Sequence, residues 1–181
     1  MKKTVTLLLL AITSITSLSV SAQNVGYINS DSVLIMTPGY LEALQSVAKE
    51  ENKYETELKN NQAELKNKLD ALVSKYNVKE GETFASLKAR MSPTDTLSLS
   101  MIQTENALVA NKKKTYEAMI SSTYAENVQP ILDKVNATIA DYAKKNGIDA
   151  IYAMENLGDQ LVYLNKERII TADIIKLVAK L

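Results

Sequence analysis

The chain has 181 residues, carries 21 Lys and Arg against 21 Asp and Glu, and contains neither Cys nor His. This composition excludes disulfides, thiolate nucleophiles, imidazole bases and the usual zinc sites, so Asp, Glu, Lys, Ser and Tyr are what remains for catalysis. The balanced charge argues against a dedicated nucleic-acid-binding protein, and we expect no cofactor and no metal site.

The first 22 residues have the three parts of a secretory signal peptide. Lys2 and Lys3 form a basic start, residues 5–18 form an apolar run diluted by Thr and Ser, and Val20-Ser21-Ala22 is a small-residue cleavage site. We therefore expect cleavage after Ala22. The apolar run is too short for a stable membrane span and no later stretch is longer, which predicts a soluble mature protein. No cysteine follows the signal, so a lipid attached through an N-terminal cysteine is excluded.

A short strand and a short helix are expected at the start of the mature chain. Residues 25–29 have the β-branched and aromatic character of a strand. Asn29-Ser30-Asp31 supplies capping residues for one or two helical turns over residues 33–36. Thr37-Pro38-Gly39 should end these turns, because Pro disfavours helix in the preceding residue and Gly breaks the helix again.

A long helix is expected from Tyr40 over about 35 residues. Its apolar residues recur at intervals of three, four or seven among Lys, Glu, Asn and Gln, and they form one narrow stripe that is closer to a coiled-coil seam than to a core-facing helix. The stripe comprises Leu41, Leu44, Ala48, Tyr54, Leu58, Leu65, Leu69, Leu72 and Tyr76.

A turn between Asn77 and Ser92 should lead into a second helix that runs from Pro93 towards Asn146. Ser92 suits the N-cap and Pro93 the first helical position. Pro130 should bend this helix by removing one backbone hydrogen bond, and Gly147 should end it after Lys144-Lys145-Asn146. The predicted stripe of the second helix comprises Leu97, Met101, Leu108, Thr115, Met119, Tyr124, Val128, Ile131, Val135, Ile139 and Tyr142.

The two helices should pair as an antiparallel hairpin about 50 Å long. With Tyr76 opposite Pro93, Lys112 and its neighbours lie beside Glu57, so that opposite charges meet across the hairpin. Residues 65–114 hold nine Lys and Arg against five Asp and Glu, a net charge of +4, and the rest of the mature chain is −6. Either these charges only solvate exposed helices, or they form a mildly basic tip that attracts acidic chains and makes peripheral contact with membrane headgroups.

Two more strands are expected after the hairpin, at residues 148–153 and 161–164, followed by a closing helix from Ala172 to Lys180 capped by Thr171. Three short strands and one short helix cannot anchor two long helices in a monomer. We therefore expect residues 23–39 and 147–181 to form a β-containing body that self-associates, with residues 40–146 as a helical arm. The residues expected in this association are Val25, Tyr27, Ile148, Ile151, Tyr152, Leu161 and Tyr163.

Three motifs frame the charged hairpin: Val25-Gly26-Tyr27-Ile28-Asn29-Ser30, residues 144–151 (Lys-Lys-Asn-Gly-Ile-Asp-Ala-Ile) and residues 170–175 (Ile-Thr-Ala-Asp-Ile-Ile). Together with the signal peptide they resemble the Skp/OmpH family of periplasmic chaperones over nearly the whole mature chain. The resemblance implies a mainly α fold with a small β body, in a homotrimer whose strands form a central body and whose three arms surround a cavity. It also implies an ATP-independent holdase that binds unfolded outer-membrane proteins in the periplasm.

Two features depart from the family. Its best-known members are strongly basic, whereas this chain is near neutral, so attraction of acidic clients or lipopolysaccharide should be weaker and no lipopolysaccharide site is carried over. The hairpin tip, which contains Phe84 as the only Phe, has no counterpart. Apolar residues such as Tyr54, Leu58, Met101 and Met119 either offer a client many weak contacts or form the hairpin's own seam.

Two other classes of function stay open on the sequence. A structural coiled-coil protein of the cell envelope would share the export signal and the apolar seam. An enzyme without His or Cys would need a Lys-activated Ser or a pair of carboxylates, and the chain shows neither a Gly-rich loop nor a convergent carboxylate cluster. We interpret Asp149, Glu155, Asp159 and Glu167 as turn and surface charges and expect no enzymatic activity.

Overall fold

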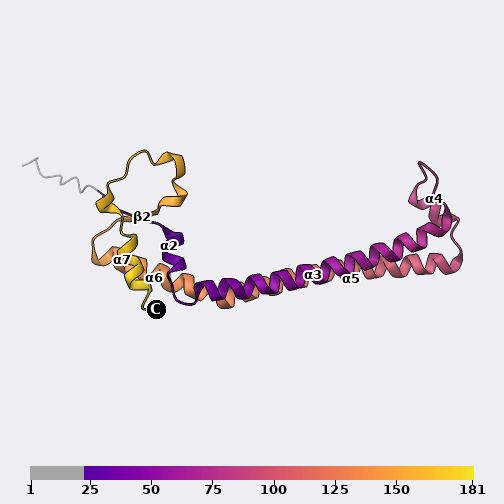
Figure 1. The fold of residues 1–181 in the computed structure, drawn as a ribbon, viewed down its shortest axis with the longest axis horizontal. Coiled ribbons are helices and arrows are strands. Elements are labelled where there is room, and N and C mark those ends of the chain that lie inside the picture. The colour runs from indigo at the N-terminus through magenta and orange to yellow at the C-terminus, as the bar shows by residue number, and fades with distance from the viewer. Residues whose placement is uncertain (1–22) are drawn as a thin grey trace, which may run out of the picture.

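The computed structural model describes residues 23–181. The predicted signal peptide and its cleavage site lie outside the described residues. A long helical hairpin extends from a small body that contains both ends of the described chain (Figure 1). Within residues 23–181, no helix combines the length and the apolarity that crossing a membrane requires.

The body contains a parallel sheet of two strands, β1 (Val25–Ile28) and β2 (Ala150–Ala153). The register places Val25 beside Ala150 and Tyr27 beside Tyr152. Gly26 lies on the face towards the core, where a Cβ would approach Ile170 Cδ1 to 3.0 Å, so only glycine fits this position without displacing its neighbour. The predicted strand at residues 25–29 is thus confirmed, and the predicted strand at 148–153 is shorter than expected.

The predicted strand at residues 161–164 is wrong. After β2 the chain winds through two 3₁₀ turns, η2 (Met154–Asn156) and η3 (Gly158–Gln160), and residues 161–165 are irregular. These turns carry the chain away from β2, so no antiparallel hairpin forms. A third turn, η4 (Lys166–Arg168), brings the chain back, and Ile169 forms an isolated parallel bridge with Tyr27 on the other side of β1.

Three helices cover the core face of the sheet: α2 (Ser30–Ile35), α6 (Gln129–Lys145) and α7 (Thr171–Val178). Asn29 caps α2 as predicted, since its side chain accepts from the N–H of Ser32. Thr171 does not cap α7: its hydroxyl oxygen accepts from the N–H of Asn29 at 2.9 Å and so fastens the start of α7 to the end of β1. The buried core consists of Ile28, Val33, Val135, Ile170, Ile174 and Val178.

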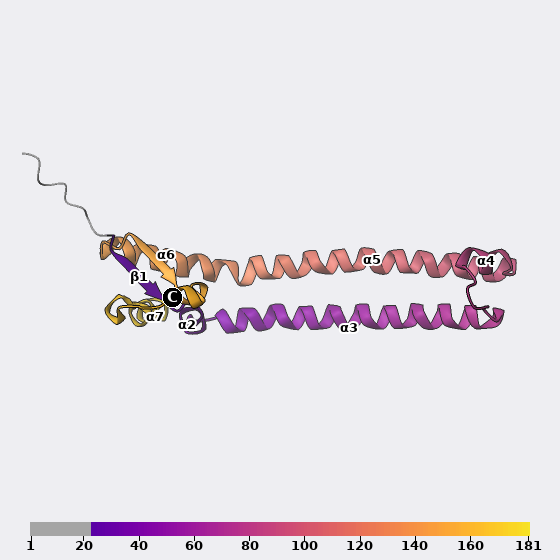
Figure 2. The ribbon, with the colours of Figure 1, turned by 90° about the horizontal axis from the view of Figure 1, so that it is seen from above.

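The arm consists of α3 (Tyr40–Val73) and α5 (Pro93–Asn127), which lie antiparallel along their lengths (Figure 2). Both helices begin at the predicted residues, and the hydroxyl of Ser92 caps α5 by accepting from the N–H of Asp95 at 3.1 Å. The bend expected at Pro130 is a break at Val128, after which α6 begins with Pro130 in its first turn.

The end of α6 is the predicted glycine stop. Gly147 has a φ of 61°, and the N–H of Ile148 donates to the carbonyl of Ala143 at 2.9 Å. This is the hydrogen bond of a Schellman motif, in which the residue after the glycine closes the last helical turn. The chain thereby leaves α6 in the direction that places β2 beside β1.

The tip contains a helix that the sequence analysis did not predict, α4 (Phe84–Ala89), which follows a 3₁₀ turn, η1 (Ser74–Tyr76). Thr83 caps α4 by accepting from the N–H of Ser86. Helix α4 folds back over the distal end of the hairpin (Figure 1). Its inner side and the residues after it complete a buried cluster with α3 and α5, formed by Leu72, Leu87, Met91 and Leu99.

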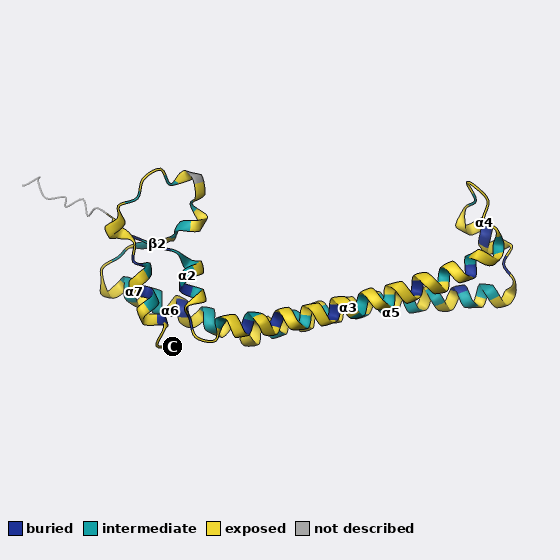
Figure 3. Cartoon of the chain, in the orientation of Figure 1, coloured by how far each residue is buried: buried dark blue, intermediate teal, exposed yellow. Residues whose placement is uncertain are grey.

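Apolar side chains are concentrated at the two ends of the arm. Ala43, Val47 and Val128 form a cluster at the base, and the tip cluster lies at the far end. Along the shaft between them, Tyr54 and Leu65 are the buried apolar residues of α3, and most of the surface is exposed (Figure 3). The shaft is therefore two helices joined by a narrow seam.

Candidate functional site

The seam side of α5 is formed by residues other than the predicted stripe. Leu99 is buried, and Ile102, Val109, Tyr116 and Ile120 are half-buried. In the predicted stripe, by contrast, Leu97, Met101, Leu108 and Met119 are 63%, 58%, 62% and 45% exposed. The predicted phase of α5 is therefore wrong over residues 97–115. Met119 contacts Tyr54 of α3 despite its exposure, and Tyr124 is 40% exposed. The remaining predicted residues, Val128, Ile131, Val135, Ile139 and Tyr142, are packed in the base and body as expected.

The four exposed residues Leu97, Met101, Leu108 and Met119 lie on one side of α5, because their spacings of four, seven and eleven residues return to nearly the same helical angle. We call them the exposed stripe. An apolar stripe with coiled-coil spacing normally faces another helix. Here α3 packs beside the stripe, contacts Met119 through the Tyr54 hydroxyl at 3.8 Å, and leaves Leu97, Met101 and Leu108 open.

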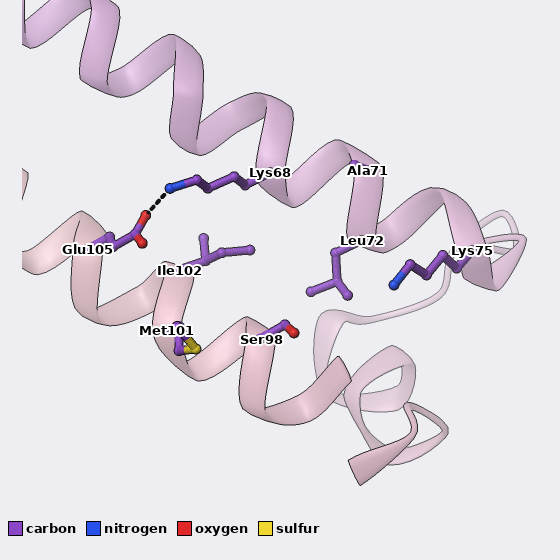
Figure 4. Close-up of a pocket in the computed structure, with 8 residues that line it drawn as sticks. All are labelled: Lys68, Ala71, Leu72, Lys75, Ser98, Met101, Ile102 and Glu105. Atoms are coloured by element: carbon purple, nitrogen blue, oxygen red, sulfur yellow. Dashed lines mark hydrogen bonds and ion pairs between the residues drawn. The ribbon is translucent and has the colours of Figure 1, made fainter. Parts of the chain in front are cut away.

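Two adjoining grooves run beside the exposed stripe along the distal half of the hairpin, with volumes of about 480 Å³ and 300 Å³. Met101 lines the first and Leu108 the second. Between α3 and α5, Leu72 and Ile102 point towards each other at the floor of the first groove (Figure 4). Lys68 crosses from α3 to Glu105 of α5 at 2.8 Å and separates the two grooves. We call this side of the arm the groove face.

Ion pairs fix the register of the hairpin. Lys112 of α5 pairs with Glu57 of α3, as the sequence predicted, and the Tyr116 hydroxyl donates to the same carboxylate at 2.7 Å. These hydrogen bonds, from Lys112 first and then Tyr116, lower the pKa of Glu57. Nearer the tip, hydrogen bonds from Lys75 and Tyr76 lower the pKa of Asp95. Both carboxylates stay charged at neutral pH and act as structural partners rather than as acids poised for proton transfer.

Tyr54, Leu58, Met101 and Met119, which the sequence left open as either client contacts or seam residues, differ in their exposure. Tyr54 is only 5% exposed and its hydroxyl donates to Met119 Sδ at 3.8 Å, so it belongs to the seam. Leu58 is half-buried. Met101 and Met119 are exposed. Met101 is therefore accessible to a partner along the arm, and Met119 is accessible while also contacting the seam through Tyr54.

The residues expected in self-association occupy three different environments. Tyr27 and Tyr152 lie together on the sheet face away from the core, with ring centroids 6.0 Å apart, and Val25 shares this face. Ile148 and Ile151 instead pack against the core of the body. Leu161 is half-buried, and Tyr163 is 83% exposed on the irregular segment after η3. Among the described residues, β2 pairs with β1 alone, so its other edge is open.

Two acidic residues of the body, Asp149 and Glu155, have structural roles. Asp149 accepts from the N–H of Asn24 at 2.8 Å, and Glu155 accepts from the N–H of Ser30 at 3.0 Å. Residues 23–181 contain no group of three or more acidic side chains arranged to hold a metal ion. Ser46 and Lys49 have the spacing of a Ser-x-x-Lys nucleophile, but both are exposed on α3 and line none of the grooves described here.

Comparison with known families agrees with this arrangement. The family model described as "Outer membrane protein (OmpH-like)" matches residues 24–178, which include the whole hairpin and nearly all of the body. The chain belongs to the OmpH-like family, and the resemblance inferred from the sequence motifs is confirmed. No individual curated protein matches the chain.

Proposed function

We propose that this protein is an ATP-independent holdase chaperone that binds unfolded outer-membrane proteins and keeps them from aggregating. The observation that carries the proposal is the exposed stripe on α5: Leu97, Met101, Leu108 and Met119 keep 45–63% of their surface open to solvent, although Met119 also contacts Tyr54 of α3. Large apolar side chains with this regular spacing indicate an interaction surface rather than scattered surface residues. Membership of the OmpH-like family supports the same function.

The stripe suits a partner without fixed structure. From Leu97 to Met119 it spans roughly 33 Å at the helical rise of 1.5 Å per residue. Each contact with a client would be weak, and several along one arm add up to a useful affinity. Methionine adapts its shape to different partners, which fits a protein that holds many client sequences.

We propose further that the body, residues 23–39 and 147–181, associates as a homotrimer. Residues 40–146 of each copy would then form one of three arms around a cavity. The open edge of β2 and the outward-facing Val25, Tyr27 and Tyr152 support this assembly, as does the exposure of Tyr163. Ile148 and Ile151 support it only indirectly, by holding the sheet on its core, and Leu161 lies on the irregular segment next to Tyr163. A two-stranded sheet is marginal by itself, and strands from neighbouring copies would complete it.

The site of action would be the periplasm, after cleavage behind Ala22. The basic, apolar and small-residue regions of residues 1–22 support export. N-terminal sequencing of the protein recovered from a periplasmic extract tests this, and the sequence should begin at Gln23.

The central experiment dilutes a urea-denatured outer-membrane β-barrel protein into buffer with the purified mature protein at low micromolar concentration, without nucleotide. Light scattering should fall as the trimer concentration approaches that of the client, and native mass spectrometry should report three copies. Full aggregation in the presence of the protein would contradict the chaperone function. If the protein were also found in a stable complex with one fixed envelope partner, the two results together would favour a structural coiled-coil protein.

A further inference from the structure

A third cleft lies at the tip, between α4 and the distal hairpin, with a volume of about 460 Å³. Its apolar lining comes from three helices and includes Leu69 of α3, Leu99 of α5 and Phe84 of α4. Apart from Leu65 and Ile102, which reach both sides of the thin seam, its residues differ from those of the groove face. We call it the tip cleft.

Phe84 is held in place by α4 without being part of the packing that holds α4. That helix is anchored by Leu87 and Met91, which are buried in the tip cluster, and by the ion pair of Arg90 with Glu82 at 2.7 Å. Phe84 itself is 48% exposed. One wall of the tip cleft is therefore an aromatic ring that is positioned by its backbone and free to contact a partner.

The rim of the tip cleft differs chemically from that of the groove face. It carries three carboxamides, Gln62, Gln103 and Asn106. Its one charged group is Lys66, which is paired with Asp70. The first groove, in contrast, is bordered by Lys68, Lys75 and Glu105. An apolar floor inside a nearly neutral rim disfavours a charged ligand, because a charge would lose its hydration without gaining an opposite charge.

We propose that the tip cleft binds one large apolar side chain, aromatic or branched, from an extended and uncharged segment of an unfolded polypeptide. A carboxamide both donates and accepts hydrogen bonds, so Gln62, Gln103 and Asn106 can pair with the N–H and C=O groups on either side of the bound residue. The electrical neutrality of the rim matches such a segment. This inference rests on the proposed holdase function and gives it a defined subsite at the tip.

The test measures the affinity of the full mature protein for a fluorescein-labelled, uncharged peptide in which Tyr and Val alternate with Ser and Thr. Phe84→Ser removes the aromatic wall, and Gln103→Glu places an unpaired charge on the rim. Each should raise the Kd by about three- to tenfold, because each removes or opposes the burial of part of one large side chain. Val78→Ser is the matched control: Val78 is 49% exposed near the same tip and lines none of the grooves, and its Kd should equal that of the wild type.

A single cysteine introduced by Asn106→Cys can carry a benzophenone, since the natural chain has no cysteine. On irradiation it should crosslink to the peptide, and Phe84→Ser should reduce the yield. Wild-type affinity in both Phe84→Ser and Gln103→Glu would overturn the proposal that the tip cleft binds the peptide, while leaving the holdase function intact. The holdase function fails separately, if the wild type does not suppress aggregation of the denatured barrel protein.

Two other occupants would each overturn the proposal in a recognisable way. Crosslinks between copies of the chain in the absence of peptide would assign the tip cleft to the chain itself. Displacement of the peptide by monomeric dodecyl maltoside from the wild type, with no displacement from Phe84→Ser, would assign it to acyl chains.

Discussion

Tyr54 of α3 and Tyr116 of α5 stack across the middle of the hairpin, with ring centroids 4.1 Å apart and ring planes 13° from parallel. The stacked pair lies in the shaft, between the apolar clusters of the base and the tip. It sits beside the ion pair of Lys112 with Glu57. Apolar contact and register-setting charge thus coincide at one level of a seam that is otherwise thin.

Replacing Tyr54 with Ala should destabilise the arm. The substitution removes a buried ring and its stacking contact with Tyr116, and we expect a loss of about 2–4 kcal/mol in the free energy of unfolding. Urea unfolding followed by far-UV circular dichroism measures it. Leu108→Ala is the control, because Leu108 is 62% exposed and its loss should change the free energy by less than about 0.5 kcal/mol. Equal effects of the two substitutions would refute the assignment of Tyr54 to the seam.

The exposed stripe should matter for holding a client and not for folding. The combined change Leu97→Ser, Met101→Ser and Leu108→Ser should alter the free energy of unfolding by less than about 1 kcal/mol. It should raise about tenfold the concentration needed to suppress aggregation of a denatured barrel protein, because three client contacts are lost. A matched triple variant, Ala107→Ser, Ala110→Ser and Asn111→Ser, changes exposed residues outside the stripe and should act like the wild type. Undiminished suppression by the stripe variant would count against the stripe as the client surface.

Self-association should depend on the sheet face away from the core. Tyr152 lies there beside Tyr27, and Tyr152→Lys places a charge where neighbouring copies would meet, which the burial of an unpaired charge opposes. We expect native mass spectrometry to report mainly monomers, while far-UV circular dichroism still reports a helical protein. Tyr124→Lys changes a tyrosine on the arm that is 40% exposed, and that variant should keep the mass of the wild-type assembly. If Tyr152→Lys stays trimeric, this face is not the interface.

The tip should loosen in acid through Glu82. Hydrogen bonds from Arg90 and from the backbone N–H of Lys79 lower the pKa of Glu82 from 4.5 to about 2. The stabilisation from this lowered pKa is therefore fully present above the ordinary pKa and disappears as the pH falls towards 2. Hydrogen exchange of the α4 amides, corrected for the intrinsic exchange rate at each pH, should show weaker protection at about pH 3 than at about pH 6. In Glu82→Gln the protection should be low at both values; a pH dependence that survives in this variant would rule out Glu82 as its cause.

The second helix shows where sequence periodicity stops being informative. Two sets of apolar residues on α5 recur at similar intervals, the exposed Leu97, Met101 and Leu108 and the packed Leu99, Ile102 and Val109. Either set could have faced α3 on spacing alone. The choice follows from tertiary pairing: the packed set is the one that continues into the tip cluster around Leu72 and Leu99 and the stacked Tyr116.

The boundaries that depend on local chemistry were predictable. Ser92 capping α5 and Gly147 ending α6 both act through the residues next to them, so the sequence contains the whole cause. The segment at residues 161–164 was not predictable in this way, because its β-rich composition acts only if the chain runs beside another strand, and η2 and η3 prevent that. Helix α4 left one usable signal, Thr83 as an N-cap ahead of Leu87, within a segment that otherwise has the composition of a turn.

The parallel pairing of β1 with β2 gives the arm a second role, as the connection between the two strands. Asn24 and Asp149 are 125 positions apart in the sequence and are joined at the start of the sheet by two hydrogen bonds: the Asp149 N–H donates to the Asn24 carbonyl, and the Asn24 N–H donates to the Asp149 carboxylate. A flexible chain of that length would lose conformational entropy when its two ends are brought together. Two antiparallel helices of nearly equal length return the chain to its starting point, so a change that lengthened only α3 or only α5 would pull the strands out of register at the opposite end of the molecule.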